Sequence, residues 1–479
     1  MIRIDPKQGE LSPRERFGLD VLLDISRLVR VDDHAMNVVS LLVTDEDLKS
    51  GIQDLVKSRG GVKTADGRVT IPRILLHWTT DVAGAAAEQR SSARDRYGRV
   101  PSSANPLVEA GLEREPILST IGAALREEVV RNANGRPVRI ACPWPEGKKW
   151  AVAFTHDLDG VEWWPLFSGV RLLESLKRKR IDLALQIGSA AIGSIGRDPL
   201  SEGARDVLDF CRKVGIRTTW FIISGIPTLQ SALIGDVTYK VDGNRARQIL
   251  RRVSEEGHEI GLHGSFSTFD DHKEFEIQKK RLQEVTNRNV RGIRQHFLKM
   301  QPGISQSGMQ DAGFVYDSTF GFADRNGFRL GAADVLPGWD EREECETAIQ
   351  EIPFMWMERA LSKYQGNEDP AAWTQDGLRL AESAQRAEGL FVTIWHPHVT
   401  SKLGYPGAFA KYQDLVKSLL EGNPFCAPLE VIHAWRTWRR SLRAKGISSD
   451  GEVWVEGRGD GYQVHLTDGA GNSAESIKR

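Results

Sequence analysis

The chain has 479 residues, which is enough for one large domain with smaller additions. Hydrophobic residues make up 40% of the chain and charged residues 27%, as is ordinary for a globular protein. Lysine and arginine number 64 against 65 aspartate and glutamate residues, a formal net charge of −1. This balance argues against a nucleic-acid partner, which needs a broad positive field.

Two further features restrict the class of protein. The four cysteines are widely scattered and form no C-x-x-C pair, which argues against a disulfide framework and a cysteine zinc site. The N-terminus has no apolar segment, and no later run is long enough to span a bilayer. We therefore expect a cytoplasmic protein without a transmembrane segment.

The first 145 residues predict an N-terminal α/β extension. Ser12-Pro-Arg-Glu15 has the pattern of a capping box, and apolar residues then recur at helical spacing up to Val29. Residues 81–104 are small and polar and predict a mobile loop or exposed helix. A proline-bearing connector over residues 141–149 marks the domain boundary.

Residues 146–440 predict the main domain, because strand-like runs alternate there with amphipathic helices. This alternation predicts a parallel sheet, either open or closed into a barrel. The predicted strands are Ala151–Thr155, Arg217–Ile223, Glu259–His263, Gly292–His296, Phe314–Tyr316, Glu351–Met355 and Leu390–Trp395. Beyond them, residues 441–479 contain two alternating runs, Glu452–Glu456 and Tyr462–Leu466, which predict a small C-terminal β-hairpin.

Polar, chemically versatile side chains follow several of these strands. The first strand leads directly into Asp157 and Asp159, and two carboxylates after a core strand are costly unless solvated, paired or bound to a metal. The other strand ends deliver His263, Arg294, His296, Asp317, His396 and His398. Each alone has an ordinary explanation, as a cap, a buried histidine or a surface ion pair. Together, at one edge of a parallel sheet, they predict an active site.

The motifs around these residues resemble those of the polysaccharide deacetylase family, over residues 150–400. Thr155-His-Asp-Leu-Asp-Gly160 is similar to the family's first motif, and the resemblance implies Asp157 as catalytic base and Asp159 as metal ligand. Gly257-His-Glu-Ile-Gly-Leu-His263 resembles the lead-in to the second motif, whose first histidine ligand is then His263. The family fold implied is a distorted (β/α) barrel with fewer than eight strands.

The later motifs assign the remaining roles by the same resemblance. Arg294 resembles the arginine that orients the base, and the backbone N–H of Phe297 would stabilise the oxyanion. His396, after the last strand, resembles the general acid. We also expect Asp317 and His398 to contact the substrate.

One position departs from the family pattern. Ser267 stands where the second motif has its second histidine ligand, and a serine hydroxyl binds zinc poorly compared with imidazole. We place the third ligand at His296, where the family normally has a proline. The alternatives are His156, beside Asp157, or water, in which case His296 contacts the substrate.

The resemblance implies a hydrolase that removes an acetyl group from an N-acetylated sugar, using a divalent metal ion, zinc in the first instance. A cytoplasmic location favours a lipid-linked or nucleotide-linked precursor as substrate. The alternatives are an inactive carbohydrate-binding relative, which Ser267 favours, and a hydrolase of another amide bond.

Overall fold

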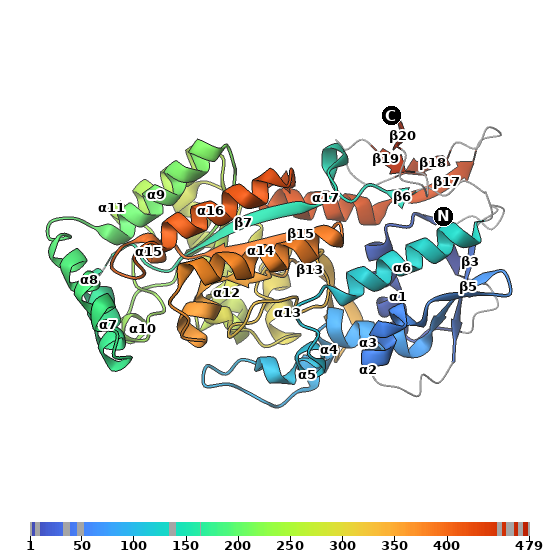
Figure 1. Cartoon of the computed structure of the whole chain (residues 1–479), viewed down its shortest axis with the longest axis horizontal. Coiled ribbons are helices and arrows are strands. Elements are labelled where there is room, and N and C mark those ends of the chain that lie inside the picture. The colour runs from blue at the N-terminus through green and yellow to red at the C-terminus, as the bar shows by residue number, and fades with distance from the viewer. Residues whose placement is uncertain are drawn as a thin grey trace.

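The computed structural model describes residues 2–4, 10–31, 39–45, 52–133, 140–162, 164–447, 453–456, 464–467 and 473–477. Parallel strands form its centre and helices surround them (Figure 1). These strands are β7 (Ala151–Leu158), β8 (Thr219–Ile223), β9 (Glu259–Gly264), β10 (Gly292–Gln295), β11 (Tyr316–Asp317), β13 (Cys345–Glu351), β14 (Trp356–Met357) and β15 (Leu390–Trp395). Each pairs in parallel with its neighbour.

A single bent segment closes this sheet into a barrel. Among these parallel strands the pairing order is β13-β11-β10-β9-β8-β7-β15-β14, and antiparallel β12 (Leu336–Asp340) pairs with β13. Strands β13 and β14 thus stand at opposite ends of the parallel order although they are near neighbours in the chain. Between them, Ile352 N–H donates to the carbonyl of Asp317 in β11 and Met355 N–H to that of Val392 in β15. With β13 and β14 as one stave, the barrel has seven staves, which confirms the expected distorted (β/α) barrel with fewer than eight strands.

The predicted strands overlap the observed ones except at one place. The sequence predicts a strand over Glu351–Met355, but only Glu351 belongs to β13, and residues 352–355 form the bend that separates β13 from β14. Pro353 lies in this bend, and proline has no N–H to donate to a strand ladder. The chain therefore stops pairing with β11 at this bend and begins pairing with β15.

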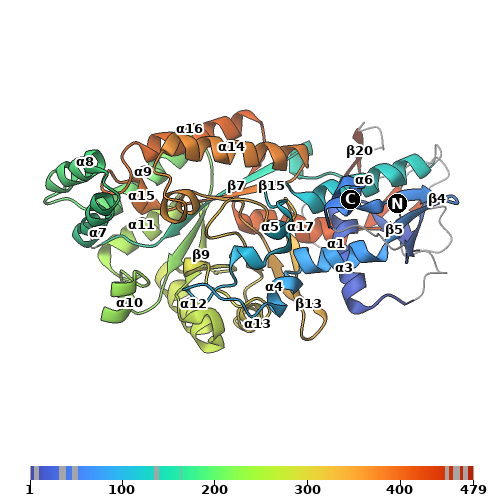
Figure 2. The same cartoon turned by 60° about the horizontal axis from the view of Figure 1, so that its bottom comes forward.

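Helices of the main domain cover the outside of the barrel (Figures 1 and 2). They are α9 (Pro199–Val214), α11 (Asn244–Glu255), α12 (His272–Thr286), α13 (Ile304–Asp311), α14 (Pro370–Arg386), α16 (Ala408–Glu421) and α17 (Leu429–Ser441). Helix α9 illustrates the local signals. The Asp198 side chain accepts the Ser201 N–H, Pro199 occupies the first turn, and left-handed Gly215 ends the helix.

The N-terminal extension has its own sheet and helices. The sheet order is β18-β17-β2-β1-β3-β5-β4, and helices α1 (Pro13–Ser26), α3 (Arg73–Ala83) and α6 (Ile117–Asn132) pack beside it. The capping box at Ser12 and Glu15 is present. The strands are β1 (Ile2–Ile4), β2 (Arg30–Val31), β3 (Val39–Thr44), β4 (Lys63–Ala65), β5 (Arg68–Pro72), β17 (Arg443–Ile447) and β18 (Val453–Glu456).

The extension shares its core with the main domain. Its apolar cluster includes Phe320, Leu330 and Trp339 from the barrel segment of the chain. Within residues 81–104, Val82, Ala83, Ala85 and Ala86 belong to this cluster, so the prediction of a mobile loop or exposed helix was wrong there. Residues 91–98 have no regular secondary structure and are mostly exposed. Arg99 is buried, and it donates a hydrogen bond of 2.7 Å to the carbonyl of Phe297. Small and polar composition alone does not reveal such a distant partner.

The C-terminal strands pair differently from the prediction. A hairpin is present, but β18 pairs with β17, which extends the N-terminal sheet. The second predicted strand overlaps β19 (Val464–Thr467), which pairs with β20 (Ser473–Ile477) and β6 (Ile140–Ala141). Alternation predicts a strand but not its partner, because every strand has two edges.

Candidate active site and metal centre

A cavity of about 450 Å³ opens at the carboxyl ends of the barrel strands. Most of the predicted site residues line it, namely Asp157, Asp159, His263, His296, Phe297, His396 and His398. They converge because β7, β9, β10 and β15 run parallel and end at the same rim. Arg294 lies directly beneath, fully buried.

Asp157 and Arg294 form a buried ion pair at the floor of the cavity. Strand β7 continues to Leu158, so Thr155 and Asp157 point to the same face of the strand. The Arg294 guanidinium donates to Asp157 Oδ1 and to Thr155 Oγ1, both at 2.7 Å. Two more bonds go to the Ser318 carbonyl and hydroxyl, so four of the five N–H groups of Arg294 have recorded partners. Burial raises the pKa of Asp157, but Arg294, His263 and His396 together outweigh burial and lower it below its usual value, so the carboxylate stays ionised.

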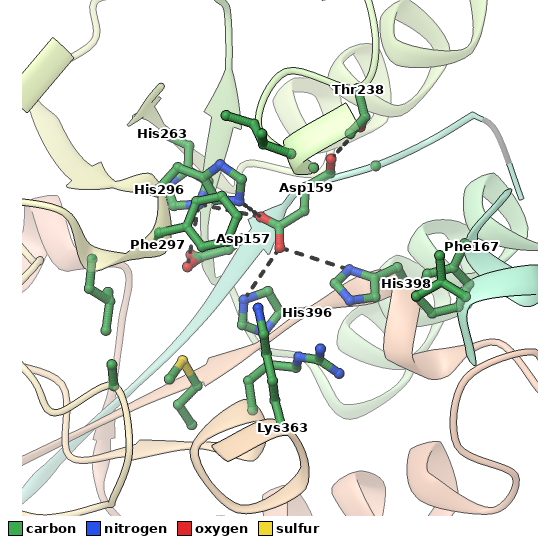
Figure 3. A pocket seen from close by; sticks show the side chains of 18 of the residues that line it. Asp157, Asp159, Phe167, Thr238, His263, His296, Phe297, Lys363, His396 and His398 are labelled. Atoms are coloured by element: carbon green, nitrogen blue, oxygen red, sulfur yellow. Dashed lines mark hydrogen bonds and ion pairs between the residues drawn. The ribbon is translucent and has the colours of Figure 1, made fainter. Parts of the chain in front are cut away.

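Asp159 lies at the centre of four histidines (Figure 3). Its Oδ1 atom is 3.3 Å from His263 Nε2 and 3.6 Å from His296 Nε2. Its Oδ2 atom is 3.6 Å from His396 Nε2 and 4.0 Å from His398 Nδ1. Thr238 donates a 2.6 Å bond to the Asp159 carbonyl and fixes its backbone. The histidines thus form two pairs around the Asp159 carboxylate. The first pair, His263 and His296, lies at Oδ1, and the second pair, His396 and His398, lies at Oδ2.

The first pair is arranged to bind a cation. His263 Nδ1 lies 2.9 Å from the Arg294 carbonyl, which can only accept, so this nitrogen carries the proton. His296 Nδ1 likewise faces the carboxylate of Asp236 at 2.9 Å. In its neutral form, which metal binding requires, each ring would therefore turn an unprotonated Nε2 towards Asp159 Oδ1. That oxygen is buried and has no hydrogen-bond partner among the described residues.

Distances support the same interpretation. One ligand atom each from Asp159, His263 and His296 can be chosen within 4.8 Å of one another. Two ligands about 2.1 Å from a tetrahedral ion lie about 3.4 Å apart, close to the separations from Asp159 Oδ1 to the two Nε2 atoms. A carboxylate with two imidazoles, each held through Nδ1 by an acceptor, is a common zinc ligand set. The residues present therefore fit a divalent metal ion.

Charge in the site also favours a cation. Burial lowers the pKa of His296, but Asp159 and Asp236 outweigh burial and raise it to about 9. Burial raises the pKa of Asp159, but His396 and His296 outweigh burial and hold it well below its usual value. The negative charge that stabilises a proton between these groups would stabilise a metal cation in the same place.

The second pair of histidines differs in its protonation. His396 Nδ1 faces Glu358 Oε1 at 2.7 Å. Burial lowers the pKa of His396, but Glu358 and Asp159 outweigh burial and raise it. For His398 Nδ1 no carboxylate nearer than Asp159 Oδ2, at 4.0 Å, is recorded among the described residues, and burial holds the pKa of His398 well below its usual value. His396 is therefore suited to carry a proton near neutral pH, and His398 is not.

Phe297 carries the backbone strain of the site. Its φ is 58° and that of Leu298 is 53°, in the left-handed region that a bulky side chain rarely adopts. Such strain is concentrated at functional sites. The Phe297 ring lines the cavity and stacks on Tyr97, with 5.5 Å between ring centroids. Its backbone N–H as an oxyanion donor remains a prediction.

Ser267, at the position of the family's usual ligand, and His156, the alternative side chain for the third ligand, both lie outside the cavity. Ser267 is exposed and is not among the residues that line the cavity, and its hydroxyl lies 3.4 Å from that of Ser265. His156 is buried on the opposite face of β7, with its ring centroid 4.7 Å from that of Trp220. Neither side chain lines the cavity with Asp159.

Asp317 requires a correction, because it does not line the cavity. Its carboxylate is fully buried and accepts hydrogen bonds from Thr319. It lies directly opposite Glu351 in the register of β11 and β13. Asp317 Oδ2 and Glu351 Oε2 are both buried without a hydrogen-bond partner among the described residues. One shared proton would satisfy both, so we assign Asp317 to the barrel interior and not to the substrate.

This carboxyl pair should make stability depend on pH. Burial, and then the charge of Asp317, raise the pKa of Glu351 well above its usual value, so the folded protein holds a proton that the unfolded chain releases. The free energy of unfolding should therefore fall as pH rises above about 4.5, by up to about 1.4 kcal/mol per pH unit. Glu351→Gln should keep the hydrogen bond and flatten this part of the profile in urea titrations from pH 5 to 8. An unchanged slope in the variant would show that the two carboxyls share no proton.

Sequence reasoning missed several residues of the site. Asp236 follows no predicted strand, and only the fold brings it to His296. Glu358 directly follows β14, so the same strand-end pattern that identified His396 could have found it. Tyr97 and Arg99 line the cavity from the N-terminal extension.

Comparison with family models and with curated proteins finds no match. Among solved structures, a Mycobacterium smegmatis protein assigned as a polysaccharide deacetylase is 20% identical, over 63% of this chain and 93% of that one, with a TM-score of 0.40. Puue allantoinase is 16% identical over 64% and 95%, with a TM-score of 0.41. The chitin deacetylase of Colletotrichum lindemuthianum is 13% identical over 61% and 89%, with a TM-score of 0.32. At identities of 20% or less and TM-scores of 0.41 or less, these likenesses assign no function to this chain.

Proposed function

We propose that this protein is a metal-dependent hydrolase that removes an acetyl group from an N-acetylated sugar. One observation carries the proposal. A cation-binding cluster, an ionised Asp157 and a proton-carrying His396 meet around Asp159 in one cavity. Hydrolysis of an amide needs these three functions and a group that stabilises the oxyanion.

The roles follow from the environments of the side chains. Asp157, kept ionised by Arg294, would accept the proton of the attacking water. Arg294 would orient that carboxylate, because its bonds to Thr155 and Ser318 hold the guanidinium in place. His396, kept protonated by Glu358, would donate its proton to the departing nitrogen. The Phe297 N–H would stabilise the negative charge that develops on the carbonyl oxygen.

Asp159, His263 and His296 would hold the metal ion, which we propose to be zinc. When bound, a divalent ion there lowers the pKa of water and polarises the carbonyl. Asp236 and the Arg294 carbonyl fix the two imidazole rings in the required orientation.

The side chains of the cavity wall suit a sugar that is linked to an anionic group. Tyr97, Phe167 and Phe297 offer aromatic faces for a sugar ring. Arg359 and Lys363 line the same wall, and no ion pair within 4.0 Å is recorded for either in the described part of the chain. A phosphate or diphosphate is the chemistry that lipid-linked and nucleotide-linked sugars share. We propose such a precursor, in the cytoplasm, as the substrate.

Two other functions are consistent with parts of the site. Ser267 favours a carbohydrate-binding protein without catalysis, because the family's usual third ligand is missing. The same catalytic groups could hydrolyse another amide, since the cavity has no recognisable code for the acyl group. Metal content distinguishes the non-catalytic binding protein from the proposed enzyme. Activity on a panel of substrates distinguishes the hydrolase of another amide from the proposed deacetylase.

The experiment is an acetate-release assay on purified protein after chelation and after zinc is added back. The panel holds chitin oligosaccharides, a nucleotide-linked N-acetylhexosamine, a lipid-diphosphate-linked one and a linear amide without a sugar. Zinc-dependent acetate release from any of the sugars supports the proposal. Zinc-bound protein that is inactive on every sugar but hydrolyses the other amide contradicts it.

His396→Ala should lower kcat by roughly 10²–10⁴-fold while leaving the melting temperature and the zinc content near wild type. Glu358→Gln should have a smaller effect on kcat and a diagnostic effect on its pH profile. Glu358 raises the pKa of His396, so its neutralisation should move the alkaline limb to lower pH. Steady-state kinetics from pH 6 to 9 measure both effects.

His398→Ala is the matched control, since His398 lines the same cavity and follows His396 by two residues. We expect it to change KM more than kcat. If His396→Ala kept full activity and His398→Ala lost it, the acid would be His398.

A further inference from the structure

Helix α7 (Trp164–Lys177) is amphipathic, but it buries polar side chains and exposes apolar ones. Its buried positions are Ser168, Arg171 and Ser175. Its exposed positions include Leu166, Val170, Leu173 and Leu176, which share one face at helical spacing. The apolar stripe thus faces outward.

The neighbouring elements continue this apolar surface. Helix α8 (Ile181–Ile192) buries Leu183 and Ile187 but exposes Ile181, Leu185 and Ile192, so it is apolar on both sides. Ile226, Leu229 and Ile234, in and before α10 (Leu229–Ile234), are also exposed. Of fourteen large exposed apolar side chains among the described residues, eleven lie between Leu166 and Ile234. Both views place α7, α8 and α10 together at the end of the molecule farthest from the N-terminal extension (Figures 1 and 2).

A basic cluster borders the apolar surface. Lys177, Arg178, Lys179 and Arg180 are all exposed where α7 ends and the chain turns into α8. Arg178 and Arg180 pair with Glu368 and Asp182. No ion pair within 4.0 Å is recorded for Lys177 or Lys179 among the described residues. Exposed apolar side chains beside free cations are typical of helices that lie on an anionic membrane surface.

This surface is continuous with the mouth of the active-site cavity. Leu166, Phe167 and Val170 of α7 and Ile234 of α10 line the cavity that contains Asp159. Phe167 lies beside His398, with 5.4 Å between ring centroids (Figure 3). Any partner that covered this apolar surface would therefore lie at the mouth of the cavity, where the substrate enters.

We propose that α7, α8 and α10 dock this protein onto the surface of an anionic lipid bilayer. No helix in the described residues is long and apolar enough to cross a membrane, so the helices would lie in the interface. The basic cluster favours an anionic bilayer over a second copy of this chain, which would bring the same cations together. Together with the proposed deacetylation, on which this step rests, the docking identifies the substrate as a sugar linked to a membrane lipid.

The test is flotation of the full-length protein with vesicles, without substrate. Vesicles of phosphatidylcholine mixed equally with phosphatidylglycerol should bind wild type, and salt should weaken binding. Leu173→Gln/Leu185→Gln should lower the affinity about tenfold or more. Lys177→Gln/Lys179→Gln should lower it roughly tenfold on mixed vesicles and leave binding to pure phosphatidylcholine unchanged. None of these four residues lines the cavity.

Ile74→Gln/Ile277→Gln is the matched control. These side chains are 49% and 45% exposed, close to the 59% and 69% of Leu173 and Leu185, but they lie on α3 and α12. We expect the control to bind vesicles like wild type. Failure of wild type to bind, or equal loss in the control and the leucine variant, would overturn the proposal.

Two further measurements separate the remaining outcomes. Sedimentation without lipid would reveal a second copy as the occupant, if wild type dimerises, the leucine variant is monomeric and neither binds vesicles. Acetate release from a soluble oligosaccharide should be unchanged in the leucine variant. An inactive wild type that still binds vesicles would refute the deacetylation alone.

Discussion

Asp157→Asn should abolish amide hydrolysis and leave the zinc content of the purified protein close to wild type. The substituted amide would keep the shape of the side chain and a hydrogen-bond acceptor for Arg294, but it could not take a proton from water. Since general base catalysis contributes roughly 10²–10⁴-fold, kcat should fall by at least that factor. Metal analysis and acetate release on the same preparation measure both quantities.

The matched control is Asp159→Asn, two residues along the same strand end. It should lose metal as well as activity, because Asp159 is the carboxylate that the histidines surround. Thermal unfolding must accompany both variants, since removing one partner of a buried ion pair can cost about 3–5 kcal/mol. A folded Asp157→Asn protein without metal would reverse the two roles.

The barrel could be predicted because its signals are local. Buried parallel strands appear in the sequence as short apolar runs, and their period of two places Thr155 and Asp157 on one face. Parallel strands in one sheet end at the same rim, so residues far apart in the chain could be expected to meet there. His263, His296 and His396 lie at that rim for this reason.

What the sequence could not show depends on contacts between distant segments. Asp236 comes from a loop without periodic pattern, and its role follows only from its 2.9 Å contact with His296. Arg99 reaches the cavity from a polar stretch whose composition resembles a loop. Asp317 has the right position at a strand end but the wrong partner, because its register neighbour Glu351 holds it in the barrel interior.

His296→Ala should lose most of its zinc, whereas Ser267→Ala should keep it. In the proposed metal site Asp159 and His263 would be two ligands, and catalytic zinc sites use three from the protein. His296 offers the third through an Nε2 atom 3.6 Å from Asp159 Oδ1, whereas Ser267 is exposed outside the cavity. Zinc affinity, measured by competition with a chromophoric chelator, should fall by more than about tenfold in His296→Ala.

The zinc affinity of Asp236→Asn tests whether Asp236 holds the His296 imidazole in place as a ligand. The amide oxygen of this variant could still accept a bond from His296 Nδ1, but without the negative charge that makes the imidazole a better ligand. Losses of about 10–100-fold are usual for such partners of metal-bound histidines, so its zinc affinity should lie between those of wild type and His296→Ala. A His296→Ala protein with wild-type zinc affinity would exclude His296 and leave water as the third ligand. In that case Asp236→Asn would also be unaffected, because Asp236 reaches the cluster through the His296 ring.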